Sequence, residues 1–230
     1  MRCLHPVVTL LAVTFTGLGM GSGLAAEEIV FRWQAASRSL LVTDLETYAA
    51  TGEPSRQLQS YFDLYSNSRG LNAMRPILNQ TMQVDFVSFE RYLRSDAGDC
   101  MLGHMATLLK PTPSSTAGKV SLRAALVNAA APDGNFNLLE IMTEYPTAQM
   151  HLDLDQMFRA NHHEQTIKDD LEEFWQKAGF PQEQLQQLEA QIFSEGSAIN
   201  QQPLNLTNID YSVLSDVSRR ICEKLGQPST

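Results

Sequence analysis

The chain has 230 residues, 43% of them hydrophobic, so it is long enough to bury a core and does not have the composition of a disordered protein. Its formal net charge is −9, with 17 basic residues against 26 acidic ones. That balance argues against proteins that bind nucleic-acid phosphates or anionic lipid through clustered Lys and Arg.

The first 25 residues have the pattern of a secretory signal peptide. Arg2 supplies a positive charge, an apolar stretch follows from Val7 to Leu18, and Gly23-Leu24-Ala25 offers a cleavage site of small residues. The apolar stretch is shorter than the roughly 20 residues that span a bilayer. We therefore expect an exported protein without a transmembrane span in its mature form. Its compartment would be the periplasm, the thylakoid lumen or the extracellular space.

The mature chain begins with a predicted β-hairpin and continues into helices. Residues 29–34 alternate as a strand does, residues 35–39 make a turn, and residues 40–42 return. Thr43 then opens a helix, with Glu46 three residues later completing a capping box. Further segments with helical spacing of apolar residues follow to about residue 109.

The stretch from residue 119 to 131 predicts the central helix of the domain. On a helical wheel Leu122 and Ala125 fall on one side, and Val120 and Val127 fall on the opposite side. A helix that is apolar on two opposed faces is normally covered on both. We therefore expect neighbours to pack against both faces.

A second capping box and a last strand complete this part of the chain. Asn137 and Glu140 predict the start of a helix that Pro146 ends, and residues 150–155 then alternate as a strand that can pair with the hairpin. The predicted fold class is mainly α. It is a compact helical domain with a small antiparallel β-sheet, made by the hairpin and this later strand, and a C-terminal helical extension.

The composition changes after residue 155. From Asp153 to Glu195 there are ten acidic residues against three basic ones, and glutamine is frequent. A final helix carries an apolar stripe of Leu214, Val217, Ile221 and Leu225. We predict three parts: a signal peptide (1–25), a helical domain (26–155), and an acidic, Gln-rich amphipathic extension (156–230). The shift in composition suggests that the domain folds without the extension.

Several landmarks recur in order along residues 26–155, and together they resemble one known family. They are Asp44-Leu45-Glu46, Thr51-Gly52, Ser95 to Gly98, Leu122-Arg123-Ala124-Ala125-Leu126, Tyr145-Pro146-Thr147 and Asp153-Leu154. The segment resembles the domain of unknown function that follows the signal peptide of exported cyanobacterial proteins. In those proteins it precedes an α/β-hydrolase domain of the esterase or lipase type. The resemblance implies export and an association with such enzymes, and it implies no catalytic residues.

A serine hydrolase of this type needs a nucleophile elbow of the form G-x-S-x-G on a parallel sheet. That pattern occurs nowhere in the chain. We therefore predict an exported, non-catalytic helical module that binds or regulates a partner such as an α/β-hydrolase supplied in trans. The alternatives are a hydrolase-related or metal-dependent enzyme, and a degenerate fragment of an α/β-hydrolase. No cofactor is predicted.

One set of side chains on the last predicted strand could hold a metal. His151, Asp153 and Asp155 alternate along it and project from one face. The alternative is the solvated face of an edge strand, with Asp155 capping the next helix. Short motifs match by chance often enough to favour this alternative, so we assign no metal site.

The cysteines leave two readings open. Cys3 departs with the leader, so Cys100 and Cys222 remain and could form one disulfide. Two separate buried thiols are the alternative, which the apolar neighbours of Cys100 favour. His104 lies one helical turn after Cys100 and could share a zinc ion with it, but two ligands do not make a site. We interpret that pair as an accident of helix spacing.

Overall fold

The computed structural model describes most of the chain after residue 24. The described residues are 25–33, 36–65, 68–113, 115–153, 155, 177–178, 181, 183–184, 186 and 202–226. The predicted signal peptide lies outside them except for Ala25, and so does nearly all of the acidic stretch predicted for residues 156–201.

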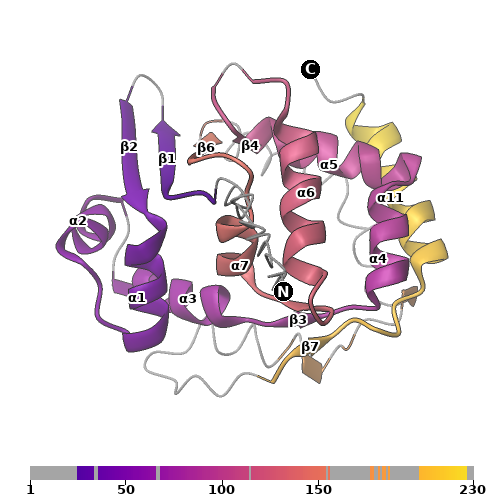
Figure 1. Cartoon of the computed structure of the whole chain (residues 1–230), viewed down its shortest axis with the longest axis horizontal. Coiled ribbons are helices and arrows are strands. Elements are labelled where there is room, and N and C mark those ends of the chain that lie inside the picture. The colour runs from indigo at the N-terminus through magenta and orange to yellow at the C-terminus, as the bar shows by residue number, and fades with distance from the viewer. Residues whose placement is uncertain are drawn as a thin grey trace, which may run out of the picture.

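The described elements run in chain order from an N-terminal hairpin to a long C-terminal helix (Figure 1). They are β1 (Glu28–Trp33), β2 (Ala36–Leu41), α1 (Val42–Thr51), α2 (Arg56–Tyr65), α3 (Ser68–Asn79), β3 (Met82–Gln83), α4 (Phe86–Leu93), α5 (Asp96–Leu108), β4 (Leu109–Lys110), α6 (Gly118–Ala130), β5 (Asn135–Phe136), α7 (Leu138–Thr143), β6 (Gln149–Asp153), β7 (Leu204–Asn205) and α11 (Tyr211–Leu225). The predicted mainly α class with a small sheet is confirmed.

The larger sheet has the strand order β2-β1-β6-β4 and is mixed. The hairpin β1–β2 is antiparallel, as expected, although residues 36–39, which were expected in its turn, belong to β2, and Val42 begins α1. Strand β6 pairs with β1 in parallel. The expectation of a purely antiparallel sheet is therefore wrong, because this later strand runs parallel to β1. A parallel neighbour needs a long crossover connection, and here the chain between β1 and β6 supplies it with helices α1 to α7.

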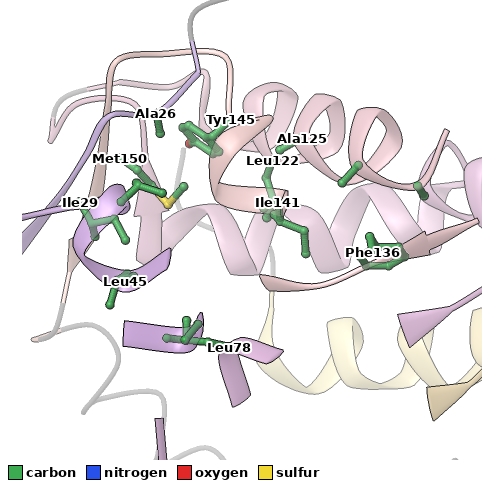
Figure 2. Close-up of a cluster of buried hydrophobic side chains, with 14 of the residues drawn as sticks. Ala26, Ile29, Leu45, Leu78, Leu122, Ala125, Phe136, Ile141, Tyr145 and Met150 are labelled. Atoms are coloured by element: carbon green, nitrogen blue, oxygen red, sulfur yellow. The ribbon is translucent and has the colours of Figure 1, made fainter. Parts of the chain in front are cut away.

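The core lies between this sheet and the helices that cover it (Figure 2). Ala125 and Tyr145 have no exposed surface, and Ile29, Leu122 and Met150 are 2–3% exposed. Helix α6 occupies the expected central place, packed against α5 and α7. The expectation that both of its faces are covered holds only in part, since Val127 packs against the core but Val120 is 62% exposed. Only the face of Leu122 and Ala125 is fully buried.

A second, smaller sheet joins distant parts of the chain. Its strand order is β5-β3-β7, with β7 parallel to β3. The backbone N–H groups of Leu204 and Leu206 donate to the carbonyl oxygens of Thr81 and Gln83, at 2.8 and 2.7 Å. Both leucine side chains are buried within the main core. Residues well beyond the predicted domain boundary thus pack with residues before it.

The helix ends match the sequence in part. Asn137 and Glu140 form the predicted capping box of α7, and Gly52 ends α1 with φ +80°, the left-handed cap conformation that glycine favours. The capping box predicted for α1 is absent, because the N-cap of that helix is Leu41, two residues before the predicted Thr43. Among the described residues, no helix combines the length and apolar character needed to cross a membrane.

Candidate functional site

Helices α5 and α11 lie side by side (Figure 1) and carry Cys100 and Cys222. Cys100 and Cys222 form a disulfide between them, with their Cα atoms 6.4 Å apart. That distance lies within the usual range for bridged cysteines. The interpretation of two separate buried thiols does not hold in this structure, because α11 returns across 122 residues of sequence to lie against α5.

A close approach of α4 and α5 sets the position of Cys100. The Ser95 side chain accepts a hydrogen bond from the Gly98 N–H at 3.1 Å and caps α5. A Cβ atom at Gly98 would lie 2.1 Å from the carbonyl oxygen of Tyr92 at the end of α4. Only glycine therefore fits at this tight corner, which explains the Ser95 to Gly98 landmark.

Helix α11 is fixed against α4 and α5 by apolar and polar contacts. Val217 and Ile221 are buried and pack with Met101 of α5. The hydroxyl groups of Tyr92 and Ser218 lie 2.8 Å apart in a hydrogen bond, and Ser218 is only 2% exposed. Burial raises the pKa of Tyr92, and the hydrogen bond with Ser218 partly offsets that increase. The disulfide therefore joins helices that are already held together by their side chains.

A groove of about 610 Å³ opens beside the disulfide, between the first turns of α5 and the face of α11 from Ser215 onward. Both cysteines line it, together with the carboxylate side chains of Asp96, Asp216 and Glu223. Both cysteines are also partly exposed to solvent. The disulfide is consequently open to small reagents from this side.

His104 belongs to the same cluster. A ring nitrogen of His104 and the two Sγ atoms of Cys100 and Cys222 all lie within 4.8 Å of one another. The His104 Nε2 atom is buried. The i, i+4 spacing of Cys100 and His104 was visible in the sequence, but Cys222 was not an evident third member. The sequence linked Cys222 to Cys100 only as a possible disulfide partner, and the packing of α11 on α5 is what brings it to His104 as well.

The three metal-ligand candidates of the last predicted strand, His151, Asp153 and Asp155, do not come together in this way. Within the described residues, Cys100, His104 and Cys222 are the one group of three metal-binding side chains whose ligand atoms come so close together. Asp153 instead forms an ion pair with Arg32, its partner residue on β1. Burial lowers the pKa of His151, and the charge of Glu28 partly opposes this. The edge-strand alternative also needs correction, because β6 lies between β1 and β4.

A second polar cluster holds the central helices together. The Asp99 carboxylate pairs with Lys119 at 2.7 Å and with Arg123, so that α5 and α6 are joined. Arg123 also donates from Nε to the Leu93 carbonyl oxygen of α4 at 3.0 Å. The hydrogen bond from Lys119, reinforced by Arg123, holds the pKa of Asp99 below its ordinary value. The arginine of the Leu122 to Leu126 landmark thus contacts two neighbouring helices.

Tyr145, which begins another landmark, is fully buried in the core beside α6 (Figure 2). Burial raises its pKa to about 12, despite the neighbouring Ser121 hydroxyl. The phenol therefore stays protonated at neutral pH. Tyr145 therefore contributes to the packed core of the domain.

Residues 25–153 match the family described as "Alpha/beta hydrolase of unknown function (DUF1400)". The chain belongs to this family. The match spans more than half of the 230 residues and begins and ends close to the domain predicted from the landmarks. No curated protein and no solved structure matches the chain. The α/β-hydrolase-related domain is thus the one assignment that the comparisons supply, and the disulfide partner Cys222 lies beyond it.

The family landmarks can be sorted by what they contact. Gly52 ends a helix, Gly98 permits a close helix corner, Arg123 joins three helices, and Tyr145 fills the core. Each of these residues contributes to folding of the helical domain. The cluster of Cys100, His104 and Cys222, by contrast, brings together side chains that can bind a metal ion.

Proposed function

We propose that this protein is an exported, non-catalytic helical module that binds an α/β-hydrolase and regulates or stabilises it. The observation that carries this proposal is the commitment of Arg123, a charged landmark residue, to contacts within the domain. Asp99 pairs with both Lys119 and Arg123, and Arg123 also donates to a backbone carbonyl oxygen of α4. Side chains committed to such contacts favour a scaffold over a catalytic site.

Export is part of the proposal. A disulfide is typical of proteins that leave the reducing cytosol, and Cys100 and Cys222 form one. The sequence adds a leader of the secretory pattern ahead of the family match. The choice of an α/β-hydrolase as the partner rests on the resemblance found in the sequence; the family description names an α/β-hydrolase but no partner.

A fluorophosphonate probe tests the proposal, because it labels the active serine of serine hydrolases. The folded chain is immobilised, incubated with the exported protein fraction of the source cells, washed and treated with the probe. We expect label on a captured protein that carries a G-x-S-x-G elbow, and none on this chain. The matched control is the same chain after thermal unfolding, which should capture no labelled protein.

The rival is that the chain is itself a hydrolase, as the family description suggests. The purified chain is therefore also assayed on short and long acyl esters, with and without divalent metal ions. Turnover that follows the chain through purification, or probe label on the chain, would favour the rival. Absence of any labelled captured protein would count against the binding module.

A further inference from the structure

Two helices bring three soft metal-binding side chains together near the groove. Cys100 and His104 lie one turn apart on α5, and Cys222 comes from the last turns of α11. One ligand atom from each residue lies within 4.8 Å of the other two. In a tetrahedral zinc site, Zn–S bonds of about 2.3 Å place two sulfur ligands about 3.8 Å apart. The cluster therefore needs only small movements to surround one ion.

We propose that Cys100, His104 and Cys222 form a Zn²⁺ site when their disulfide is reduced. The same two sulfur atoms then have two exclusive states, a covalent bridge or a pair of thiolate ligands. The metal would replace the bridge as the link between α5 and α11. This inference does not depend on the function proposed above.

The chemistry balances with a phosphine as the reductant. The phosphine attacks one sulfur, the S–S bond breaks and the other sulfur leaves as a thiolate that takes up a proton. Water then hydrolyses the phosphonium adduct, and the products are two thiols and one phosphine oxide. Zn²⁺ then displaces one proton from each thiol, so that two thiolates and one neutral imidazole bind it. Two thiolates and one imidazole are ligands that favour Zn²⁺ over hard cations such as Mg²⁺ or Ca²⁺.

The surroundings suit a site with an open fourth position. The His104 Nε2 atom is buried, while both cysteines line the groove of about 610 Å³. The ion would therefore be held by the protein on one side and reached from solvent on the other. A water molecule from the groove can complete four ligands, as in zinc sites with three protein ligands.

Cobalt titration tests this proposal directly. The full chain carries a Cys3→Ser substitution, so that Cys100 and Cys222 are its remaining thiols. It is titrated with Co²⁺ in the oxidised form and after phosphine reduction, and then with Zn²⁺ in competition. We expect one Co²⁺ per reduced chain, with a thiolate charge-transfer band and tetrahedral d–d bands that Zn²⁺ abolishes. The oxidised chain should show neither band.

Variants separate this site from loose binding by an acidic protein. His104→Gln should weaken Zn²⁺ binding by at least about tenfold, since it removes one ligand of three. His104→Cys should restore it, and His151→Gln, which changes the other described histidine, should leave it unchanged. Equal binding by the reduced and oxidised chains would overturn the proposal. So would a His104→Gln variant that binds Zn²⁺ as tightly as its parent.

Reduction removes a crosslink and could unfold the chain, so a melt accompanies each titration. Zn²⁺ should raise the melting temperature of the reduced parent, or restore a cooperative melt if reduction abolishes it. The oxidised chain and the reduced His104→Gln variant should show no such increase. A reduced parent whose melt Zn²⁺ does not change would contradict the proposal.

Discussion

The family-matched region, residues 25–153, and the C-terminal segment, residues 202–226, are held in the fold by different means. The first contains its own sheet, a buried central helix and the ionic cluster of Asp99, Lys119 and Arg123. The second is attached to the first by a two-residue strand, one buried helix face and the disulfide.

This difference shows that a family match need not mark the end of a folding unit. Leu204 and Leu206 lie outside the match, yet both are buried in the same core as Leu122 and Tyr145. Val217 and Ile221 cover part of α5 in addition. The three-part division predicted from composition stays a prediction, and the burial of these residues weighs against independent folding of its middle part.

The largest effect is expected from ending the chain after Asp155, which removes the C-terminal segment and leaves the family-matched region alone. The truncated chain loses Leu204, Leu206 and the helix face of Val217 and Ile221. Emptying the site of one large buried aliphatic side chain costs about 2–5 kcal/mol, and domains are stable by only about 5–15 kcal/mol. We expect the truncated chain to show no cooperative thermal melt by circular dichroism. A melt close to that of the full chain would establish residues 26–155 as an independent domain.

A smaller loss is expected from removing the crosslink alone. The bridge closes a loop of 122 residues, for which the chain-entropy model gives about 4–5 kcal/mol. Cys222→Ser should lower the free energy of unfolding by up to about that amount in urea denaturation. Cys3→Ser is the matched control and should change nothing. A Cys222→Ser variant as stable as its parent would mean that the contacts of α11 suffice without the bridge.

The sequence could predict what depends on local spacing. The hairpin, the Gly52 cap, the Asn137 capping box and the apolar stripe of α11 all follow from residues within a few positions of one another. The extent of the family resemblance followed from the landmarks to within a few residues of the match. The two small sheets were harder, because β3, β4, β5 and β7 have two residues each and leave no periodic signal.

What the sequence could not predict depends on contacts across long separations. The parallel direction of β6, the ion pair of Arg32 with Asp153, and the meeting of Cys222 with His104 each need the three-dimensional path of the chain. The exposed Val120 shows the same limit, because the helical wheel identifies an apolar face but not whether a neighbour covers it. The sequence therefore identified the Cys100–His104 pair of the candidate site, but not that Cys222 lies beside both residues.

The buried face of α6 offers a test within the family-matched region. Ala125 has no exposed surface, so Ala125→Leu must displace its neighbours and should destabilise by about 1–3 kcal/mol through overpacking. Val120→Leu on the exposed face of the same helix is the matched control, expected within about 0.5 kcal/mol of the parent. Equal melting temperatures for the two variants would show that α6 is not packed as described.

The smallest expected effect concerns Asp99. It compares the two regions of the chain through the pH dependence of their contributions to stability. Lys119 and Arg123 hold its pKa below the ordinary 3.8 in the folded chain. The folded state therefore binds this proton less readily than the unfolded state, so its stabilising effect is fully present above about pH 4 and is lost as pH falls through the lowered pKa. Because the Asp99 side chain is 42% exposed, Asp99→Asn should cost only about 1 kcal/mol at neutral pH.

The parent and the Asp99→Asn variant should therefore approach equal stability as the solution is acidified below the ordinary Asp pKa. Asp216→Asn is the matched control from the C-terminal segment, since Asp216 pairs with Arg219 on the surface of α11, where both side chains are more than 60% exposed. Solvent screens such a pair, so this variant should match the parent across the whole range. Urea denaturation of the three proteins at a series of pH values measures both differences. An Asp99→Asn deficit that persists unchanged into acid would mean that the side chain stabilises the fold through its shape rather than its charge.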